Sequence, residues 1–263
     1  MRLAADGWRV DYIVTIRFGT REFAPRTLMT LLTVVVFASL VALGRWQVRR
    51  AAETQTLWDE FAAGADAAVT IDARTPQIRQ FEHVRLTGRY DPAHQILIDG
   101  MEGPAGRNGY YVLTPFEFTG GGWILVDRGW IPLQGDPQTK PSVPVSGATR
   151  TVVGRADELP RPGIRLGGGQ PLGPPFPVVA LYPRLTDIAK LLHVAEWAPA
   201  AQQVLLDPGQ PDGYYRHWSP PGFPPIRHTA YAVQWFLLAA TLLVIYVVTN
   251  LRPLGGRKAK FDG

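Results

Sequence analysis

A histidine stands at the head of an apolar segment close to the end of the chain, in the run Arg227-His228-Thr229-Ala230-Tyr231-Ala232-Val233-Gln234-Trp235-Phe236. An ionisable side chain at membrane depth is costly, so such a residue is a candidate functional residue. A neutral imidazole nitrogen is a common ligand of transition metals. His228 is therefore the first candidate metal ligand.

Further groups with useful chemistry surround His228 or precede it by about 180 residues. On a helix, His228, Tyr231, Ala232 and Trp235 share one face. Aromatic rings, a metal ligand and cations that can pair with carboxylates are the groups that a haem with two propionates uses. The candidate cofactor-binding residues are the ligand His228, the aromatic walls Trp46, Tyr231 and Trp235, the amides Gln47 and Gln234, and the cations Arg45, Arg49, Arg50 and Arg227.

Two alternatives stay open for these residues. Trp and Tyr at helix ends are ordinary membrane-interface residues, and an interfacial His is often a simple anchor. Gln234 is harder to explain in that way, because it lies roughly 9 Å deeper than His228 by helical rise. It needs a hydrogen-bonding partner on a neighbouring helix or on a ligand.

Two uncharged apolar segments, 27–44 and 229–249, must position these residues. The first rises roughly 27 Å as a helix, and both are long enough to span a bilayer. No small-residue cleavage site follows the first segment, so we expect a retained anchor. Basic residues before the first span and after the second predict that both termini are cytoplasmic. Gly44 to Gln47 and the head of the second span should then lie at the same membrane face.

The intervening residues 45–227 are enough for one domain with a substantial core. A helix is expected to continue to Ala63 and to end at Gly64. The triple glycine 120–122 predicts a hairpin turn, a helix is expected near 185–193, and the loops 160–177 and 208–225 are rich in Pro and Gly or in aromatic residues. Strands in a mainly antiparallel sheet are predicted at 81–90, 95–99, 110–118, 123–127, 149–155 and 204–207.

Composition and motifs exclude several function classes. The chain has no cysteine, which excludes thiolate-held iron–sulfur clusters. The net charge of +5 resides largely in the membrane flanks, so we expect anionic lipid and no nucleic acid as the partner. No hydrolase elbow, zinc-protease or Rossmann motif is present, so we expect no enzyme. The other histidines, His83, His94, His193 and His217, are expected to be structural, with His217 the best reserve ligand.

Four motifs in order resemble the SURF1/Shy1 family of cytochrome oxidase assembly factors. They are Leu43-Gly44-Arg45-Trp46-Gln47-Val48-Arg49-Arg50, Asn108-Gly109-Tyr110-Tyr111-Val112-Leu113-Thr114-Pro115-Phe116, Val126-Asp127-Arg128-Gly129-Trp130-Ile131-Pro132 and His228-Thr229-Ala230-Tyr231-Ala232-Val233-Gln234-Trp235-Phe236. The resemblance places the family's histidine on His228 and its Gly-x-Trp-Gln element on Gly44, Trp46 and Gln47. It assigns no role to Arg128-Gly129-Trp130 or to the 160–177 loop.

The resemblance implies transient binding of haem a and its insertion into the catalytic subunit of cytochrome c oxidase. The haem a synthesis machinery is a further expected partner, and a scaffold that contacts nascent subunits without holding cofactor is the alternative. A sensing protein is a weaker third possibility. The expected class is a membrane-anchored α+β protein of the bacterial inner membrane, with two transmembrane helices flanking one mainly antiparallel β domain. Its expected parts are a cytoplasmic arm 1–26, a first span 27–44, a periplasmic β-rich domain 45–227, a second span 228–249 and a cytoplasmic basic tail 250–263.

Overall fold

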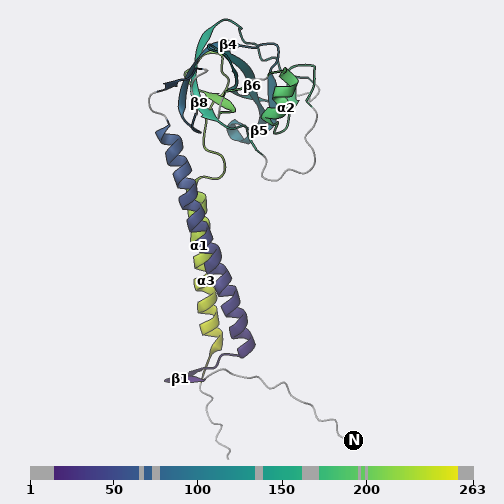
Figure 1. The fold of residues 1–263 in the computed structure, drawn as a ribbon. Coiled ribbons are helices and arrows are strands. Elements are labelled where there is room, and N and C mark those ends of the chain that lie inside the picture. Colours follow the sequence, from purple (N-terminus) through teal and green to yellow (C-terminus); the bar gives the residue numbers. More distant parts are fainter. Residues whose placement is uncertain are drawn as a thin grey trace, which may run out of the picture. The chain divides into compact units, whose positions relative to one another are not determined.

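The computed structural model describes residues 15–64, 68–72, 78–133, 139–161, 172–194, 197–198 and 201–253. The chain divides into two units, one formed by 1–58 with 221–263 and the other by 59–220. Figure 1 shows the elements of both. Each unit is described by itself.

Two long helices make up most of the first unit. Helix α1 covers Thr27–Ala63 and helix α3 covers Pro225–Asn250, and they run side by side in Figure 1. Thr30 near the start of α1 lies 2.8 Å from the Tyr246 hydroxyl near the end of α3. Gln47, further along α1, meets His228 near the start of α3. The helices are therefore antiparallel, as two spans joined by an outside domain require.

Both helices are long and apolar enough to cross a membrane. Helix α1 begins at Thr27, and the predicted continuation to Ala63 with an end at Gly64 is confirmed. Helix α3 begins at Pro225, slightly before the predicted span. Proline suits this first helical position because the amide hydrogen it lacks would have no partner there.

A small sheet joins the outer flanks of the two helices. It contains β1 (Ile16–Phe18), β2 (Arg21–Phe23) and β11 (Leu251–Pro253), in the order β1-β2-β11. Leu251 pairs with Phe23 in an antiparallel register, and the Ala24 amide donates to the Asn250 carbonyl at 3.0 Å. No local pattern in the sequence predicts these strands. The pairing holds the start of α1 next to the end of α3.

The second unit is a β domain built on one sheet of the order β3-β4-β8-β10-β7-β6-β5-β9. An additional pairing of β4 with β6 closes β4, β8, β10, β7 and β6 into a small five-stranded barrel. Its strands are β3 (Val69–Thr70), β4 (His83–Tyr90), β5 (Ile96–Glu102), β6 (Asn108–Phe118), β7 (Trp123–Pro132), β8 (Arg150–Asp157), β9 (Val178–Ala180) and β10 (Gln203–Leu206).

Most strand pairs are antiparallel, which confirms the predicted character of the sheet. The pairs β10 with β7, β3 with β4 and β5 with β9 are parallel. The predicted hairpin turn is also confirmed, since Gly120, Gly121 and Gly122 between β6 and β7 have φ values of 101°, 92° and 116°. Glycine adopts such angles without steric cost.

Two apolar clusters stabilise the β domain. The barrel interior contains Val84, Leu86, Phe116, Val126 and Val204, all fully buried. The second cluster lies where the short helix α2 (Leu185–Leu192) buries Ile188 against β5, β6 and β7. A single 3-10 turn, η1 (Pro104–Gly106), precedes β6.

The structure describes only part of the 160–177 loop but all of the 208–225 loop. Residues 162–171 of the 160–177 loop lie outside the described residues, and 172–177 hold no helix or strand. The 208–225 loop is described throughout, and its residues Tyr214, Tyr215 and Trp218 pack on the β domain. Trp218 donates from Nε1 to the Leu206 carbonyl at 2.8 Å and meets Tyr111 edge to face.

Candidate functional site

His228 is engaged by Gln47 across the helix pair. The two residues are 181 positions apart, and the distance from His228 Nδ1 to Gln47 Oε1 is 2.9 Å. Gln47 is 9% exposed, whereas His228 is only half-buried. The predicted meeting of the first span's exit with the second span's entry is thus confirmed at the level of side chains.

Small residues allow this close approach of the helices. A Cβ on Gly44 would lie 2.7 Å from Cε1 of Phe236, which is closer than real Cβ atoms come to a neighbour. Ala232 and Ala239 on α3 are each 3% exposed. Small residues at a helix contact are the usual means of close packing in a membrane. Gly44 therefore serves to bring Gln47 within reach of His228.

The hydrogen bond selects one tautomer of the neutral imidazole. Gln47 Oε1 only accepts, so His228 Nδ1 carries the hydrogen and donates it. In a neutral imidazole the other nitrogen, Nε2, then keeps its lone pair. A metal-ligating histidine is commonly oriented by such a bond from its second nitrogen. His228 is therefore prepared chemically to act as a ligand through Nε2.

The predicted aromatic residues differ in exposure, and Gln234 lies on another face of α3. Trp235 is half-buried, while Trp46 and Tyr231 are each 49% exposed. Gln234 is exposed and has no hydrogen-bond partner among the described residues. At about 100° per residue, Gln234 points away from the α3 face that holds Ala232 and Ala239. The structure does not bring Gln234 together with His228.

The four predicted arginines remain accessible. Arg45, Arg49, Arg50 and Arg227 are all exposed. Arg50 pairs with Glu53 at 3.0 Å on the same helix. The Arg227 guanidinium lies 4.8 Å from the centre of the Phe223 ring. On α1, Arg50 lies three positions after Gln47 and shares its face, whereas Arg45 and Arg49 lie two positions to either side of Gln47 and leave the helix on nearly the opposite side.

In the β domain, Arg128 is a buried cation held by carbonyl and other neutral oxygens. It is 2% exposed, and its Nε donates to the Asp212 carbonyl at 2.8 Å. One terminal nitrogen donates to Gln95 Oε1 at 2.8 Å and the other to the Pro144 carbonyl at 2.8 Å. Burial lowers the pKa of Arg128. The arginine thus connects three loops to the barrel, a role that was not predicted from the sequence.

The next two residues fasten the 208–225 loop. Gly129 has a φ of 108°, and a Cβ there would lie 2.6 Å from the Tyr215 carbonyl. Trp130 pairs with Tyr215 in an isolated antiparallel bridge and donates from Nε1 to the Met101 carbonyl at 2.9 Å. The Arg128-Gly129-Trp130 element is therefore a structural clasp. Adjacent Asp, Arg and Gly residues inside an otherwise apolar strand were the sequence signal for it.

Asp127 is a second buried ionisable group. It is 1% exposed, and its Oδ1 accepts the Gly129 amide hydrogen at 2.9 Å. Burial raises the pKa of its carboxyl to about 7, against the lowering effect of the Gly129 hydrogen bond. Asp157 adds a smaller rise.

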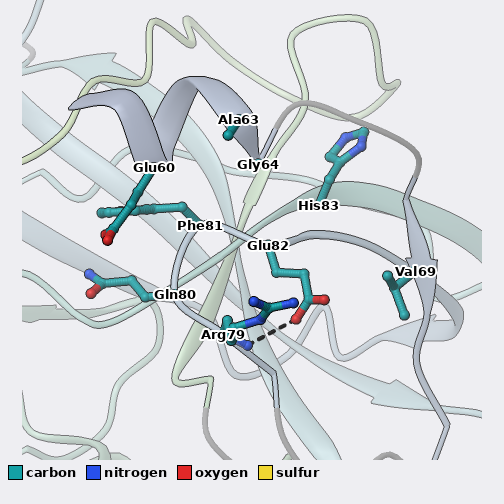
Figure 2. A pocket seen from close by; sticks show the side chains of 9 residues that line it. All are labelled: Glu60, Ala63, Gly64, Val69, Arg79, Gln80, Phe81, Glu82 and His83. Carbon is teal, nitrogen blue, oxygen red and sulfur yellow. Dashed lines mark hydrogen bonds between the residues drawn. The ribbon is translucent and has the colours of Figure 1, made fainter. Parts of the chain in front are cut away.

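A pocket of the β domain lies apart in sequence from all these groups. The pocket has a volume of about 540 Å³. Figure 2 shows its lining, which combines the end of α1 at Glu60, Ala63 and Gly64 with Val69 and residues 79–83. The Arg79 amide donates to Glu82 Oε2 at 2.9 Å. None of the predicted site residues lines it.

Three of the other histidines have structural surroundings, as predicted. His83 lies 2.6 Å from Asp207, and His94 lies 2.6 Å from Asp91. His193 is the C-cap of α2 with a left-handed backbone at φ 53°. Within the described residues, no cluster of His, Asp and Glu has the geometry of a metal site.

Comparison with known proteins places the chain in a family. A model of the SURF1 family matches residues 34–240. Over 101 residues the chain is 30% identical to a SURF1-like protein of Rickettsia felis, covering 38% of this chain and 45% of that protein. Over 103 residues it is 31% identical to a SURF1-like protein of Rickettsia bellii, covering 38% of this chain and 43% of that protein. These alignments span less than half the length of the relatives. The family model, in contrast, matches most of this chain and includes both Gln47 and His228, so the chain belongs to the SURF1 family.

Proposed function

We propose that the chain is a membrane-embedded assembly factor for cytochrome oxidase that binds haem a reversibly through His228. The observation that carries the proposal is the hydrogen bond between His228 Nδ1 and Gln47 Oε1 across the two helices. It presents an imidazole of defined tautomer at one end of an antiparallel helix pair. Family membership supports the assembly role.

The residues present fit a haem in chemical type. When bound, haem a supplies an iron that accepts an axial nitrogen ligand. His228 offers Nε2, and Trp235, Trp46 and Tyr231 offer ring faces on the two helices. Arg45, Arg49, Arg50 and Arg227 offer guanidinium groups that pair with propionates. Lipid around the helices accepts a hydrophobic tail. Gln234, which points away from His228, has no part in this site.

Gln47 is the positioning residue of the proposal. It holds the imidazole by its Nδ1–H and so fixes where Nε2 points. His228 is the one axial ligand that the proposal assigns to the protein. Release of haem is easier with one protein ligand than with two, because one ligand binds the iron less tightly. His228 is half-buried and Gln47 is buried, so the amide is sheltered while the imidazole stays open.

We further propose that α1 and α3 span the inner membrane of a bacterium with the β domain in the periplasm. The flanks that precede α1 and follow α3 pair in one small sheet, which carries Arg17, Arg21 and Arg252. Arginines at the outer ends of both helices favour the cytoplasmic side for both termini. An alkaline phosphatase fusion in the 139–161 region should be active, and a fusion after Pro253 should be inactive.

The partners follow from this proposal. The catalytic subunit of cytochrome c oxidase receives the haem, the haem a synthesis machinery delivers it, and the chain itself carries out no covalent chemistry. The second candidate function is a scaffold that binds nascent subunits through the β domain and holds no cofactor. The observation that favours it is the separate β domain, with a closed barrel and a pocket beside the end of α1, which haem binding between two helices does not require.

A spectrum of the purified protein separates the two candidates. We expect the full chain, purified from cells that make haem a, to show a haem a spectrum that is lost in His228→Ala. His94→Ala is the matched control, because His94 pairs with Asp91 in the β domain. Equal haem content in all three proteins would exclude His228 as the ligand. A colourless wild type that still co-purifies with the catalytic subunit would establish the scaffold instead.

A further inference from the structure

Gln234 is a polar side chain in the apolar part of α3, and the described part of the chain offers it no hydrogen-bonding partner. The run 229–249 holds no charged residue, and Gln234 is exposed within it. Among the described residues no group hydrogen-bonds its amide. By contrast, Thr229 and Thr249 on the same helix both donate to carbonyls of their own helix. Thr241 resembles Gln234 in being exposed and without a partner in the described chain.

These two polar residues define one face of α3, opposite to the face that contacts α1. Gln234 and Thr241 are seven positions apart, which is close to two helical turns. The exposed apolar residues Leu238 and Ile245, at 51% and 54% exposure, lie on the same side. The α1-facing side carries the buried Ala232 and Ala239. We refer to the opposite side as the outer face of α3, and define it by Gln234, Leu238, Thr241, Ile245 and Val248.

An amide exposed to hydrocarbon is unfavourable until it finds a hydrogen-bonding partner. Moving a polar group from water to an apolar medium without a hydrogen bond costs several kcal/mol. A hydrogen bond from another helix to the Gln234 amide would therefore stabilise α3 in a membrane. Interhelical hydrogen bonds of Gln and Asn side chains are a known means of joining transmembrane helices.

We propose that the outer face of α3 is a dimer interface in which Gln234 of one copy hydrogen-bonds Gln234 of a second copy. A carboxamide both donates and accepts, so two identical amides satisfy one another around a twofold axis along the membrane normal. Two copies inserted in the same direction place Gln234, and likewise Thr241, at the same depth. The seven-residue spacing keeps this face in contact along a left-handed helix pair, where one polar residue in the seam sets the register. A foreign helix would need a matching polar group at that depth.

The proposal rests on α3 spanning the membrane, as proposed above, and is independent of haem binding. The absence of cysteine from the chain makes disulfide mapping direct. Leu238→Cys places a thiol on the outer face, and Ala240→Cys places one on an exposed position about 160° away around the helix. The purified full chain carrying either cysteine is reconstituted into phosphatidylcholine vesicles and treated with a mild oxidant.

We expect Leu238→Cys to give a disulfide dimer and Ala240→Cys to give little. In the same chain, Gln234→Leu should weaken dimerisation by about threefold to thirtyfold, as measured by energy transfer between labelled copies. Asparagine at this position, Gln234→Asn, should restore part of the dimerisation. Equal cross-linking at the two cysteines, or no effect of Gln234→Leu, would overturn the proposal. Alkaline carbonate extraction of the vesicles reports insertion separately. If carbonate removes the protein from the vesicles, the proposal that α3 spans the membrane is wrong. If the protein stays inserted but is monomeric, only the dimer proposal is wrong, and the haem proposal is unaffected.

Discussion

Replacing Asp127 by asparagine should make the β domain less sensitive to alkaline pH. The folded protein holds the pKa of this carboxyl at about 7, whereas its ordinary value is 3.8, and burial is the main cause. Between these values the unfolded chain has released the proton while the folded chain still keeps it. Stability contributed by this group is therefore greatest below about pH 4, is lost as the pH rises toward 7, and stays low above that.

The size of the effect follows from the two pKa values. One pKa unit corresponds to about 1.4 kcal/mol, so ionisation of the buried carboxyl costs roughly 2 kcal/mol at pH 5 and roughly 4 kcal/mol at pH 8. Asparagine has nearly the same shape and can still accept the Gly129 amide hydrogen through its oxygen. Any fixed cost of the substitution is equal at both pH values and cancels. Asp127→Asn should thus gain about 2 kcal/mol more over the wild type at pH 8 than at pH 5.

Thermal unfolding of the full chain in detergent tests this directly. For a domain of this size, 1 kcal/mol shifts Tm by about 2–4 °C, so the variant should gain about 4–8 °C more at pH 8 than at pH 5. Asp157, whose pKa burial also raises, is present in both proteins, and its repulsion with Asp127 acts in the same direction as the burial of Asp127. A difference in Tm that is the same at pH 5 and pH 8 would refute the raised pKa of Asp127.

Three further substitutions test the contacts of the two units. Arg128→Met should destabilise the β domain by about 3–5 kcal/mol in urea unfolding, because the acceptors around the guanidinium lose their donors, and a cost below about 1 kcal/mol would refute the clasp. Gly44→Val should lower the thermal stability of the helix pair by about 1–3 kcal/mol, and a second change, Phe236→Ala, should restore much of it. Gln47→Leu should weaken haem binding by about tenfold to a hundredfold in an absorbance titration while Gln47→Glu, which keeps an acceptor, binds more tightly than the leucine variant.

Local patterns predicted the elements that are long enough to show a period. Strands β4 and β6 and the glycine hairpin follow from alternation and turn chemistry over eight or more residues. The strands β1, β2 and β11 have three residues each, too few for any period to appear. Closure of the barrel comes from the pairing of β4 with the second half of β6, a contact between distant segments that no local pattern encodes.

The candidate site shows the same limit in side-chain detail. Antiparallel spans predicted that the neighbourhood of Gln47 would meet that of His228, and the structure confirms it. The rotation of each helix about its axis was not predictable from the face rule alone. Packing of Ala232 and Ala239 against α1 sets that rotation, so Trp235 is turned partly inward while Gln234 points outward.

Asp127 and Arg128 are adjacent buried charges of opposite sign that do not neutralise one another. Successive strand residues point to opposite faces. Asp127 pairs with Leu113 of β6, and the Leu113 side chain belongs to the cluster beneath α2. Arg128 points to the other face, where it lies 3.4 Å from the Thr114 hydroxyl. Each group therefore bears its own cost of burial, and the double variant Asp127→Asn with Arg128→Met should show the sum of the two single effects within about 0.5 kcal/mol in urea unfolding at pH 8. A coupling energy above about 1 kcal/mol would mean that the two charges do interact through the strand, and would require a new account of why the carboxyl holds its proton.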